Sequence, residues 1–267
     1  MKKLFVKLAL TPIALPLLIL GASTYAIADD TKTLSVNIST DYVTEYVFRG
    51  VTLAGEAFQP GAEASYGNFT AGVWVSLASG EESAAFDDEI DLYAGYAFDI
   101  NDKVSANIGA TLYHYPQKGG LFDIGKNDAS TIEPYGGLSF NVPFSPSLTA
   151  YYDVTLDAFT IEGGAEYSIP MGGKVGEKMG EKTNLDISGA IGSVSVDGGT
   201  DYQYGSLSLA LSYALASNTS VYAGVNGGLS SKDSFVDTNF DLADLANTVG
   251  APNSSSVWFS VGISSGF

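Results

Sequence analysis

The residues of this sequence that could do chemistry are mostly carboxylates, and they recur in segments where apolar and polar side chains alternate. In the first such segment, the aliphatic side chains of residues 34–38 occupy the even positions. Successive side chains of a strand point to opposite faces, so Asp41, Glu45 and Arg49 are expected on the other face. In the other segments the same alternation places further carboxylates on the face opposite the aliphatic side chains. If the segments close into a barrel, this face points inward and lines a pore. The ten predicted pore-lining carboxylates are Asp41, Glu45, Glu63, Glu89, Asp91, Glu133, Asp153, Glu162, Glu166 and Asp186.

Arg49 is the only arginine of the chain and the one basic residue predicted among these acids. Its guanidinium group is always charged and forms a planar fork that fits a carboxylate. One interpretation is that Arg49 pairs with inward acids and so stabilises the wall of the barrel. A solvated charge near the outer rim is the alternative.

The excess of inward acids limits what the interior can be. A dry, packed interior could not hold so many unpaired carboxylates, because each would cost several kcal/mol or become protonated. The interior is therefore expected to be wet, or the acids to bind cations. A wet passage lined by acids favours cations over anions. A register slip of one residue would turn the acids outward, into lipid, where charges are costly.

An enzyme would need a different set of residues. The only histidine, His114, has outward parity in its segment and lies beside Tyr113 and Tyr115, which predicts a place in an interfacial aromatic belt. A lipid-facing active site is the alternative, but no Ser-His-acid spacing, phosphate loop or cluster of metal ligands accompanies it. We therefore expect no catalytic residue, no metal site and no cofactor.

The elements that would position these residues are twelve alternating segments. They cover residues 34–50, 58–67, 69–79, 88–100, 104–115, 130–141, 148–157, 159–169, 184–196, 203–215, 219–230 and 255–267. Segments of about ten residues with apolar-out, polar-in alternation are typical of a membrane barrel, which has an even strand number in single-chain bacterial examples. The prediction is an all-β fold, a single antiparallel transmembrane β-barrel of about 12 strands with a narrow lumen. The long connection 170–183 leaves 10 or 14 strands open.

The two ends of the chain fit an exported barrel. Lysines before an apolar run at residues 8–20, followed by Ala26 and Ala28, predict a signal peptide of residues 1–28 that is cut after Ala28. Residues 29–267 would form the barrel. The last segment, which ends on Phe267, resembles the closing strands of bacterial outer-membrane barrels, which commonly end on an aromatic residue, and this resemblance implies a membrane-insertion signal at Phe267. A transmembrane anchor at the start and a soluble sandwich are the alternatives.

Composition excludes several classes of function. The chain has 30 acidic against 12 basic residues, a net charge of −18, whereas nucleic-acid binding needs lysine and arginine to neutralise phosphates. No cysteine is present, so disulfides and thiolate catalysis are excluded. Aromatic residues near strand ends, such as Tyr42, Tyr46, Phe48 and Tyr113, suggest girdles at the two membrane interfaces.

The first hairpin has the most distinctive sequence, STDYVTEYVFRGVTLAGEAFQPGAEASYGNFTAGVWVS, over residues 39–76. Two Tyr-Val pairs are followed by Phe48-Arg49-Gly50 and then by Gln59-Pro60-Gly61. This run resembles the TorF-type porin family, a proteobacterial outer-membrane group whose function is largely unassigned. The resemblance implies an outer-membrane β-barrel that could serve as a channel, and it supplies no catalytic residues.

Taken together, these features predict a narrow, cation-preferring porin or channel for small solutes. A non-conducting structural or adhesive barrel is the first alternative, and a lipid-modifying outer-membrane enzyme is the less favoured one. The expected partners are outer-membrane lipid and lipopolysaccharide, the barrel-insertion machinery, and small solutes or cations. The expected location is the bacterial outer membrane.

Overall fold

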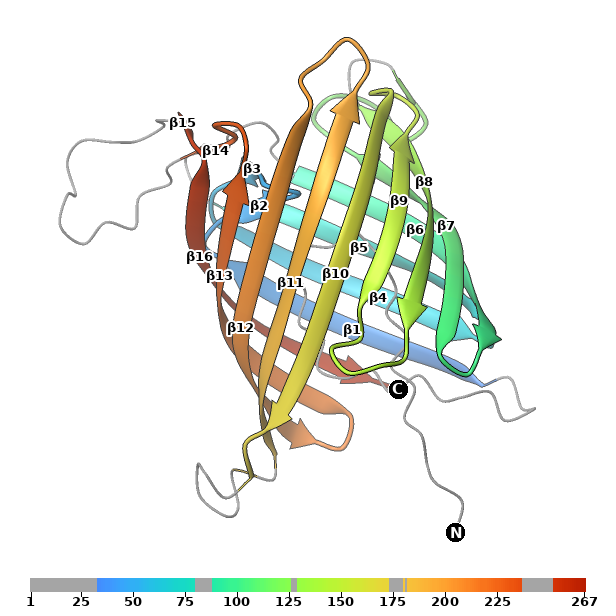
Figure 1. Ribbon diagram of the computed structural model, residues 1–267, viewed down its shortest axis with the longest axis vertical. Coiled ribbons are helices and arrows are strands. Elements are labelled where there is room, and N and C mark those ends of the chain that lie inside the picture. Colours follow the sequence, from blue (N-terminus) through green and yellow to red (C-terminus); the bar gives the residue numbers. More distant parts are fainter. Residues whose placement is uncertain (1–32, 80–87, 126–128, 173–179, 181, 237–251) are drawn as a thin grey trace, which may run out of the picture.

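The chain forms a closed antiparallel β-barrel of twelve strands, seen in the computed structural model of Figure 1. The structure describes residues 33–79, 88–125, 129–172, 180, 182–236 and 252–267. Around the barrel the strands follow the order β1-β16-β13-β12-β11-β10-β9-β8-β7-β6-β5-β4, and β4 returns to β1. The predicted fold class and the strand number of twelve are confirmed, so the alternatives of 10 and 14 strands are wrong.

The strand bounds follow the predicted segments closely. They are β1 Leu34–Val43, β4 Ala57–Tyr66, β5 Phe69–Ala78, β6 Asp88–Asn101, β7 Val104–His114, β8 Ser130–Phe140, β9 Ser147–Asp153, β10 Ala158–Pro170, β11 Thr183–Val196, β12 Tyr202–Ala216, β13 Thr219–Ser230 and β16 Ser255–Gly266. The first and last strands close the ring, with register from Asn37↔Gly266 to Val43↔Ser260.

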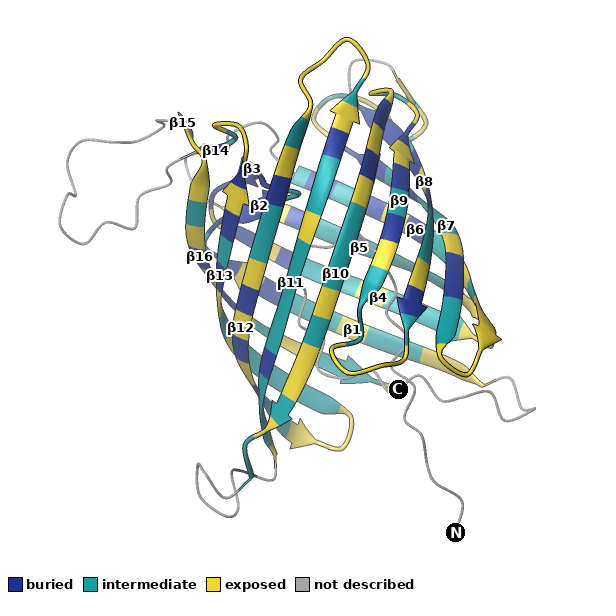
Figure 2. Cartoon of the chain, in the orientation of Figure 1, coloured by how far each residue is buried: buried dark blue, intermediate teal, exposed yellow. Residues whose placement is uncertain are grey.

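The alternation of side chains separates an apolar outer surface from a polar interior. In β12, Leu207, Leu209 and Leu211 are 54%, 40% and 51% exposed, whereas Ser208 between them is completely buried. In β16 the buried Trp258 and Ser260 alternate with the exposed Val257, Phe259 and Val261, and bands of buried, intermediate and exposed residues cross the other strands (Figure 2). Closure pairs each of the twelve barrel strands on both sides, so the barrel leaves no strand edge open, as lipid would require.

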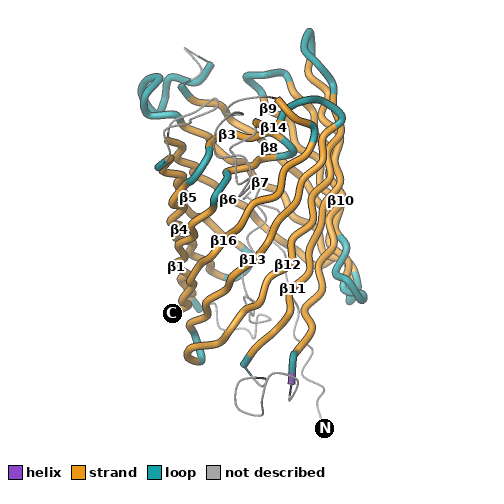
Figure 3. Tube along the Cα trace, turned by 90° about the vertical axis from the view of Figure 1, so that its left-hand side faces the viewer, coloured by secondary structure: helices purple, strands orange, loops and turns teal. Residues whose placement is uncertain are grey.

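The two ends of the barrel differ in their connections. Short turns 67–68, 102–103, 141–146 and 217–218 lie at the end that also holds the start of β1 and the end of β16, which we call the turn end (Figure 3). The opposite end, the loop end, carries the connections after β1, β5, β7, β9, β11 and β13. Among the described residues no helix is long and apolar enough to cross a membrane.

The long connection 170–183 joins neighbouring strands at the turn end. Pro170 pairs with Asn184, and the Met171 amide donates to the Thr183 carbonyl at 2.9 Å. Strands β10 and β11 are therefore consecutive in the ring, and no strand is missing between them. Residues 173–179 and 181 lie outside the described residues, as does the predicted signal peptide 1–28.

The first segment departs from its prediction as a single strand over residues 34–50. Strand β1 ends at Val43, and the chain then forms a separate hairpin of β2 (Tyr46–Phe48) and β3 (Val51–Ala54). Arg49 and Gly50 form its two-residue turn with φ of 47° and 75°. Positive φ at both central residues is the geometry of a type I′ turn, which matches the twist of a hairpin.

This hairpin, which we call the inner hairpin, packs inside the barrel at the loop end. One side of it joins a buried cluster of Val43, Tyr46, Leu53, Ala54, Ala57, Trp74 and Tyr93. On the other side Val47 packs with Phe235 and Trp258. Phe235 belongs to β14 (Phe235–Val236), which pairs with β15 (Pro252–Asn253) beside the barrel rim. Buried apolar area therefore holds the inner hairpin to two parts of the wall.

Candidate functional site: the interior of the barrel

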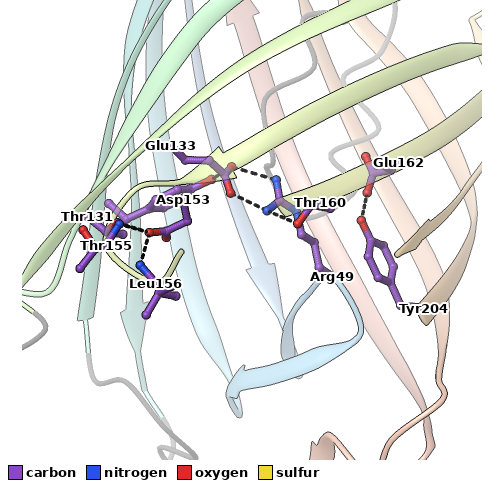
Figure 4. A network of polar contacts seen from close by, with 10 residues as sticks. Arg49, Thr131, Glu133, Asp153, Thr155, Leu156, Thr160, Glu162 and Tyr204 are labelled. Atoms are coloured by element: carbon purple, nitrogen blue, oxygen red, sulfur yellow. Dashed lines mark hydrogen bonds and ion pairs between the residues drawn. The ribbon is translucent and has the colours of Figure 1, made fainter. Parts of the chain in front are cut away.

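Arg49 reaches from the tip of the inner hairpin to the far wall of the barrel. Its Nη1 and Nη2 donate to the two carboxylate oxygens of Glu133 on β8 at 2.7 and 2.9 Å, and Nη1 lies 3.5 Å from Thr160 Oγ1 on β10 (Figure 4). Such bidentate pairs are strong and directional. Arg49 therefore pairs with an inward acid, although it does so from the hairpin and not from the first strand.

Aromatic rings enclose the guanidinium group. Its central carbon lies 4.7 Å from the ring centroid of Phe48 and 4.1 Å from that of Tyr151, distances at which a cation is attracted to a ring. Burial alone would lower the pKa of Arg49, but the negative charge and hydrogen bonds of Glu133 raise this pKa above its ordinary value. Arg49 stays charged, and the ion pair persists, across the whole physiological pH range.

Tyrosine hydroxyl groups donate hydrogen bonds to five of the ten inward acids, including Glu133. The donor–acceptor pairs, with their distances, are Tyr46 to Glu89 at 3.0 Å, Tyr93 to Glu63 at 3.1 Å, Tyr113 to Glu133 at 3.0 Å, Tyr204 to Glu162 at 2.5 Å and Tyr222 to Asp41 at 2.7 Å. A hydrogen bond to an ionised group is stronger than one between neutral groups. These pairs hold carboxylates in place without adding positive charge.

Serine and threonine hydroxyls hold three further acids. Glu45 accepts from Thr52 at 2.5 Å and also from Ser256. Asp153 accepts from Thr131 at 2.5 Å and from the amides of residues 155 and 156 at 2.9 Å each. Asp186 accepts from Ser168 at 2.6 Å.

The structure places the ten predicted acids on inward faces, in two groups by exposure. Seven are buried, namely Asp41, Glu45, Glu89, Asp91, Glu133, Asp153 and Asp186, and three are half-buried, namely Glu63, Glu162 and Glu166. Glu45 is the exception in location, because it lies between β1 and β2 and not within a barrel strand. The half-buried acids are those that water inside the barrel can reach.

The tyrosines are the residues that the sequence interpretation missed. Tyr46 and Tyr113 were expected in interfacial girdles, but they are 3% and 5% exposed and contact interior acids. Phe48 also lies inside, with its ring centroid 6.0 Å from that of Tyr113. Of the girdle residues named from the sequence, Tyr42 is exposed, at 37%. The parity of Tyr113, which it shares with Asn107 and Thr111, would have predicted its inward direction.

His114 is also placed differently from its prediction. It is 7% exposed, and its Nδ1 lies 2.9 Å from Ser130 Oγ and 3.1 Å from the Ala129 carbonyl oxygen. The connection after β7 closes over it, since Ser130 Oγ donates to the Leu121 carbonyl at 2.9 Å. A buried histidine held by these groups is not exposed to lipid, which contradicts its place in an aromatic belt.

Within the described ranges, no group of three or more histidine, cysteine, aspartate or glutamate residues is arranged to hold a metal ion. The described lysines, Lys103, Lys118, Lys182 and Lys232, all lie in connections outside the barrel strands. In the part of the chain that the structure describes, Arg49 is thus the one basic side chain inside the barrel. Among the described residues, the interior therefore holds a large excess of acidic over basic side chains.

An apolar outer wall, a ring with no open edge and a polar interior define this molecule as a β-barrel with the architecture of membrane porins. The chain belongs to the Gcw_chp family, described as a bacterial protein of unknown function, whose model matches residues 25–264. A search of curated proteins gave no match.

Solved porins share the fold at low sequence identity. The chain is similar to the KdgM porin, with 14% identity, a TM-score of 0.52, and coverage of 87% of this chain and 99% of that one. A second KdgM structure, described as in complex with disordered oligogalacturonate, gives a TM-score of 0.53 at the same identity and coverage. The NanC porin follows with 11% identity, a TM-score of 0.49, and coverage of 86% and 98%. At 14% identity the likeness to the two KdgM structures concerns the fold alone.

Proposed function

We propose that the protein is an outer-membrane channel of the porin type, which passes small solutes and prefers cations. One observation carries this proposal: the interior of a closed barrel presents ten carboxylates against a single arginine. A passage lined by acids concentrates cations and repels anions. The porin neighbours and the resemblance of residues 39–76 to TorF-type porins support the same class. The proposal includes export by cleavage after Ala28, insertion aided by Phe267, and contact with lipopolysaccharide.

The half-buried acids would set the selectivity. Glu63, Glu162 and Glu166 lie on β4 and β10 and retain contact with the interior space, so an ion that passes would meet them first. The buried acids contribute through their field, which is weakly screened because little water surrounds them. By the usual arrangement of such barrels, short turns face the periplasm and longer loops face outside. The inner hairpin would then narrow the outer half of the passage.

The test is the reversal potential of the refolded barrel in a planar bilayer under a salt gradient. We expect a cation-selective potential, which Glu63→Gln lowers clearly and Asp91→Asn, whose carboxylate is 3% exposed, lowers less. An anion-selective potential would contradict the charge argument. Barrels that insert, as shown by protease protection, but carry no current would contradict the channel itself.

The second candidate is a non-conducting structural or adhesive barrel. The observation that favours it is the inner hairpin, which crosses the interior and is fixed on the far wall by Arg49. The absence of current in the native barrel, together with current after removal of the hairpin, would support this candidate. An enzyme is less favoured, because the hydroxyl that contacts the buried His114, Ser130 Oγ, is itself buried and donates its proton to the Leu121 carbonyl.

A further inference from the structure

Four oxygen atoms on one patch of the interior wall are buried and accept or donate no hydrogen bond. They are Glu166 Oε1 on β10, Asp186 Oδ2 and Ser188 Oγ on β11, and Ser208 Oγ on β12. We call these four residues the wall cluster. The other inward acids of this region, such as Glu162 with Tyr204, have a hydroxyl partner. The wall cluster is therefore a concentration of oxygen atoms that lack a donor.

The strand register places the four side chains next to one another. Glu166 is directly opposite Ser188, and Ser188 is directly opposite Ser208. Neighbouring strands lie about 4.8 Å apart, so these three side chains form a continuous row. Asp186 lies two residues from Ser188 on the same face, diagonal to Glu166, and diagonal neighbours are within reach of long side chains.

The unpaired oxygen atoms of the wall cluster are buried, so bulk water does not supply the hydrogen bonds that the protein leaves unmade. Ser208 is completely buried, and Asp186 is 8% exposed. A buried polar atom without a hydrogen bond costs about 1–3 kcal/mol, and more when it is charged. Asp186 Oδ1 already accepts a hydrogen bond from Ser168 at 2.6 Å, whereas its Oδ2 has no donor.

The wall cluster also lacks positive charge. No lysine or arginine of the described residues forms an ion pair with Glu166 or Asp186, and the two carboxylates repel each other. Two carboxylates and two hydroxyls are an all-oxygen set, the kind that Ca²⁺ binds, with water completing its coordination and with tolerance of irregular geometry. Mg²⁺ requires a nearly ideal octahedron and is a poorer match.

We propose that Glu166, Asp186, Ser188 and Ser208 bind a Ca²⁺ ion on the inner wall of the barrel. This donor set has only two acids, so it differs from clusters of three acidic or histidine ligands. The inference rests on the proposed water-filled interior, because the ion must reach the wall through it. Bound Ca²⁺ would tie β10, β11 and β12 together and would reduce the local negative charge that a passing cation meets.

The test is a calorimetric titration of the full-length refolded barrel in detergent with CaCl₂, after removal of bound metal with a chelator. We expect one Ca²⁺ per chain with a Kd of about 10⁻⁴–10⁻³ M, as for weakly charged extracellular sites. Asp186→Asn should weaken binding at least about tenfold, which corresponds to ~1.4 kcal/mol. Ser208→Ala removes one oxygen without changing charge and should weaken binding less.

Glu162→Gln is the matched control, since this acid lies on the same strand as Glu166 and has Tyr204 as its partner. It should leave the Ca²⁺ affinity unchanged. A difference in SDS-gel migration between the unheated and the heated protein shows that each variant is folded, and Ser208→Ala keeps the test valid if Asp186→Asn misfolds. No binding by the native barrel, or equal binding by Ser208→Ala, would overturn the site. A barrel that binds Ca²⁺ but carries no current would refute the channel and leave the site standing.

Discussion

The two halves of the barrel interior are built differently. At the loop end, the inner hairpin, the Arg49–Glu133 pair and large aromatic rings fill the space. Toward the turn end, inward positions carry small hydroxyl side chains, such as Ser65 with Thr70 and Ser220 with Ser264, which bond one another at 2.9 and 3.1 Å. The difference teaches that one wall can support a hairpin and large rings at one end and small hydroxyl side chains at the other.

Removal of the inner hairpin should have the largest effect on the difference between the loop-end and turn-end halves of the interior. Replacement of residues 46–54 by a short Gly-Ser linker would leave the barrel strands intact and make the loop-end half resemble the turn-end half. We expect single-channel conductance to rise several-fold, because the element that crosses the interior is gone. The measurement is conductance in planar bilayers, with circular dichroism to verify the strand content. Unchanged conductance would show that the hairpin does not narrow the passage.

Loss of one partner of the ion pair should have the next largest effect. Arg49→Ala leaves Glu133, which is 5% exposed, as an uncompensated buried charge, and such changes cost about 3–5 kcal/mol. The free energy of unfolding in urea, measured in lipid vesicles, should fall by this order. Glu63→Gln is the turn-end comparison and should cost only about 1 kcal/mol, the value of one hydrogen bond.

The double variant Arg49→Met with Glu133→Leu sharpens the interpretation of this effect. It removes both charges, so most of the lost stability should return, because paired apolar replacements of buried ion pairs are often neutral. A double variant as unstable as Arg49→Ala would show that hairpin packing, and not the unpaired charge, explains the loss.

The smallest expected effect comes from glycines under the tyrosines. A methyl group at Gly192 would overlap the ring of Tyr204, whereas at Gly164 it would meet Ser147 Oγ at 3.0 Å, a group that can rotate away. Gly192→Ala should therefore displace Tyr204 from Glu162 and cost about 1–3 kcal/mol, the range for overpacking. Gly164→Ala should cost less in the same urea titration. Equal costs would contradict the close packing of the Tyr204 ring against Gly192.

The sequence predicts the barrel well because each strand contacts lipid on one face and the interior on the other. This arrangement imposes a period of two, and Leu207, Leu209 and Leu211 show it directly. The inner hairpin could not be predicted from the period-two alternation. Its alternation continues that of β1, and its turn uses Arg49-Gly50, where Asn-Gly would be the recognisable signal.

The interior acids were predicted in direction but not in environment. Parity places Glu162 and Glu133 on inward faces, yet it contains no information on which tyrosine or arginine reaches them across the barrel. Arg49 and Glu133 are 84 residues apart in the chain, and Tyr222 and Asp41 are 181 apart. Such pairs form only when the barrel closes and the inner hairpin folds into it. A local sequence pattern predicts neither event.

Both tryptophans of the chain lie against the inner hairpin. Trp74 packs with Tyr46 at 5.4 Å between ring centroids, and Trp258 packs with Val47 from a strand at the other side of β1. The tryptophan fluorescence of the protein therefore reports on the position of the inner hairpin. An undocked hairpin would shift the emission to longer wavelength while the strands stay paired, so its motion can be followed without any label.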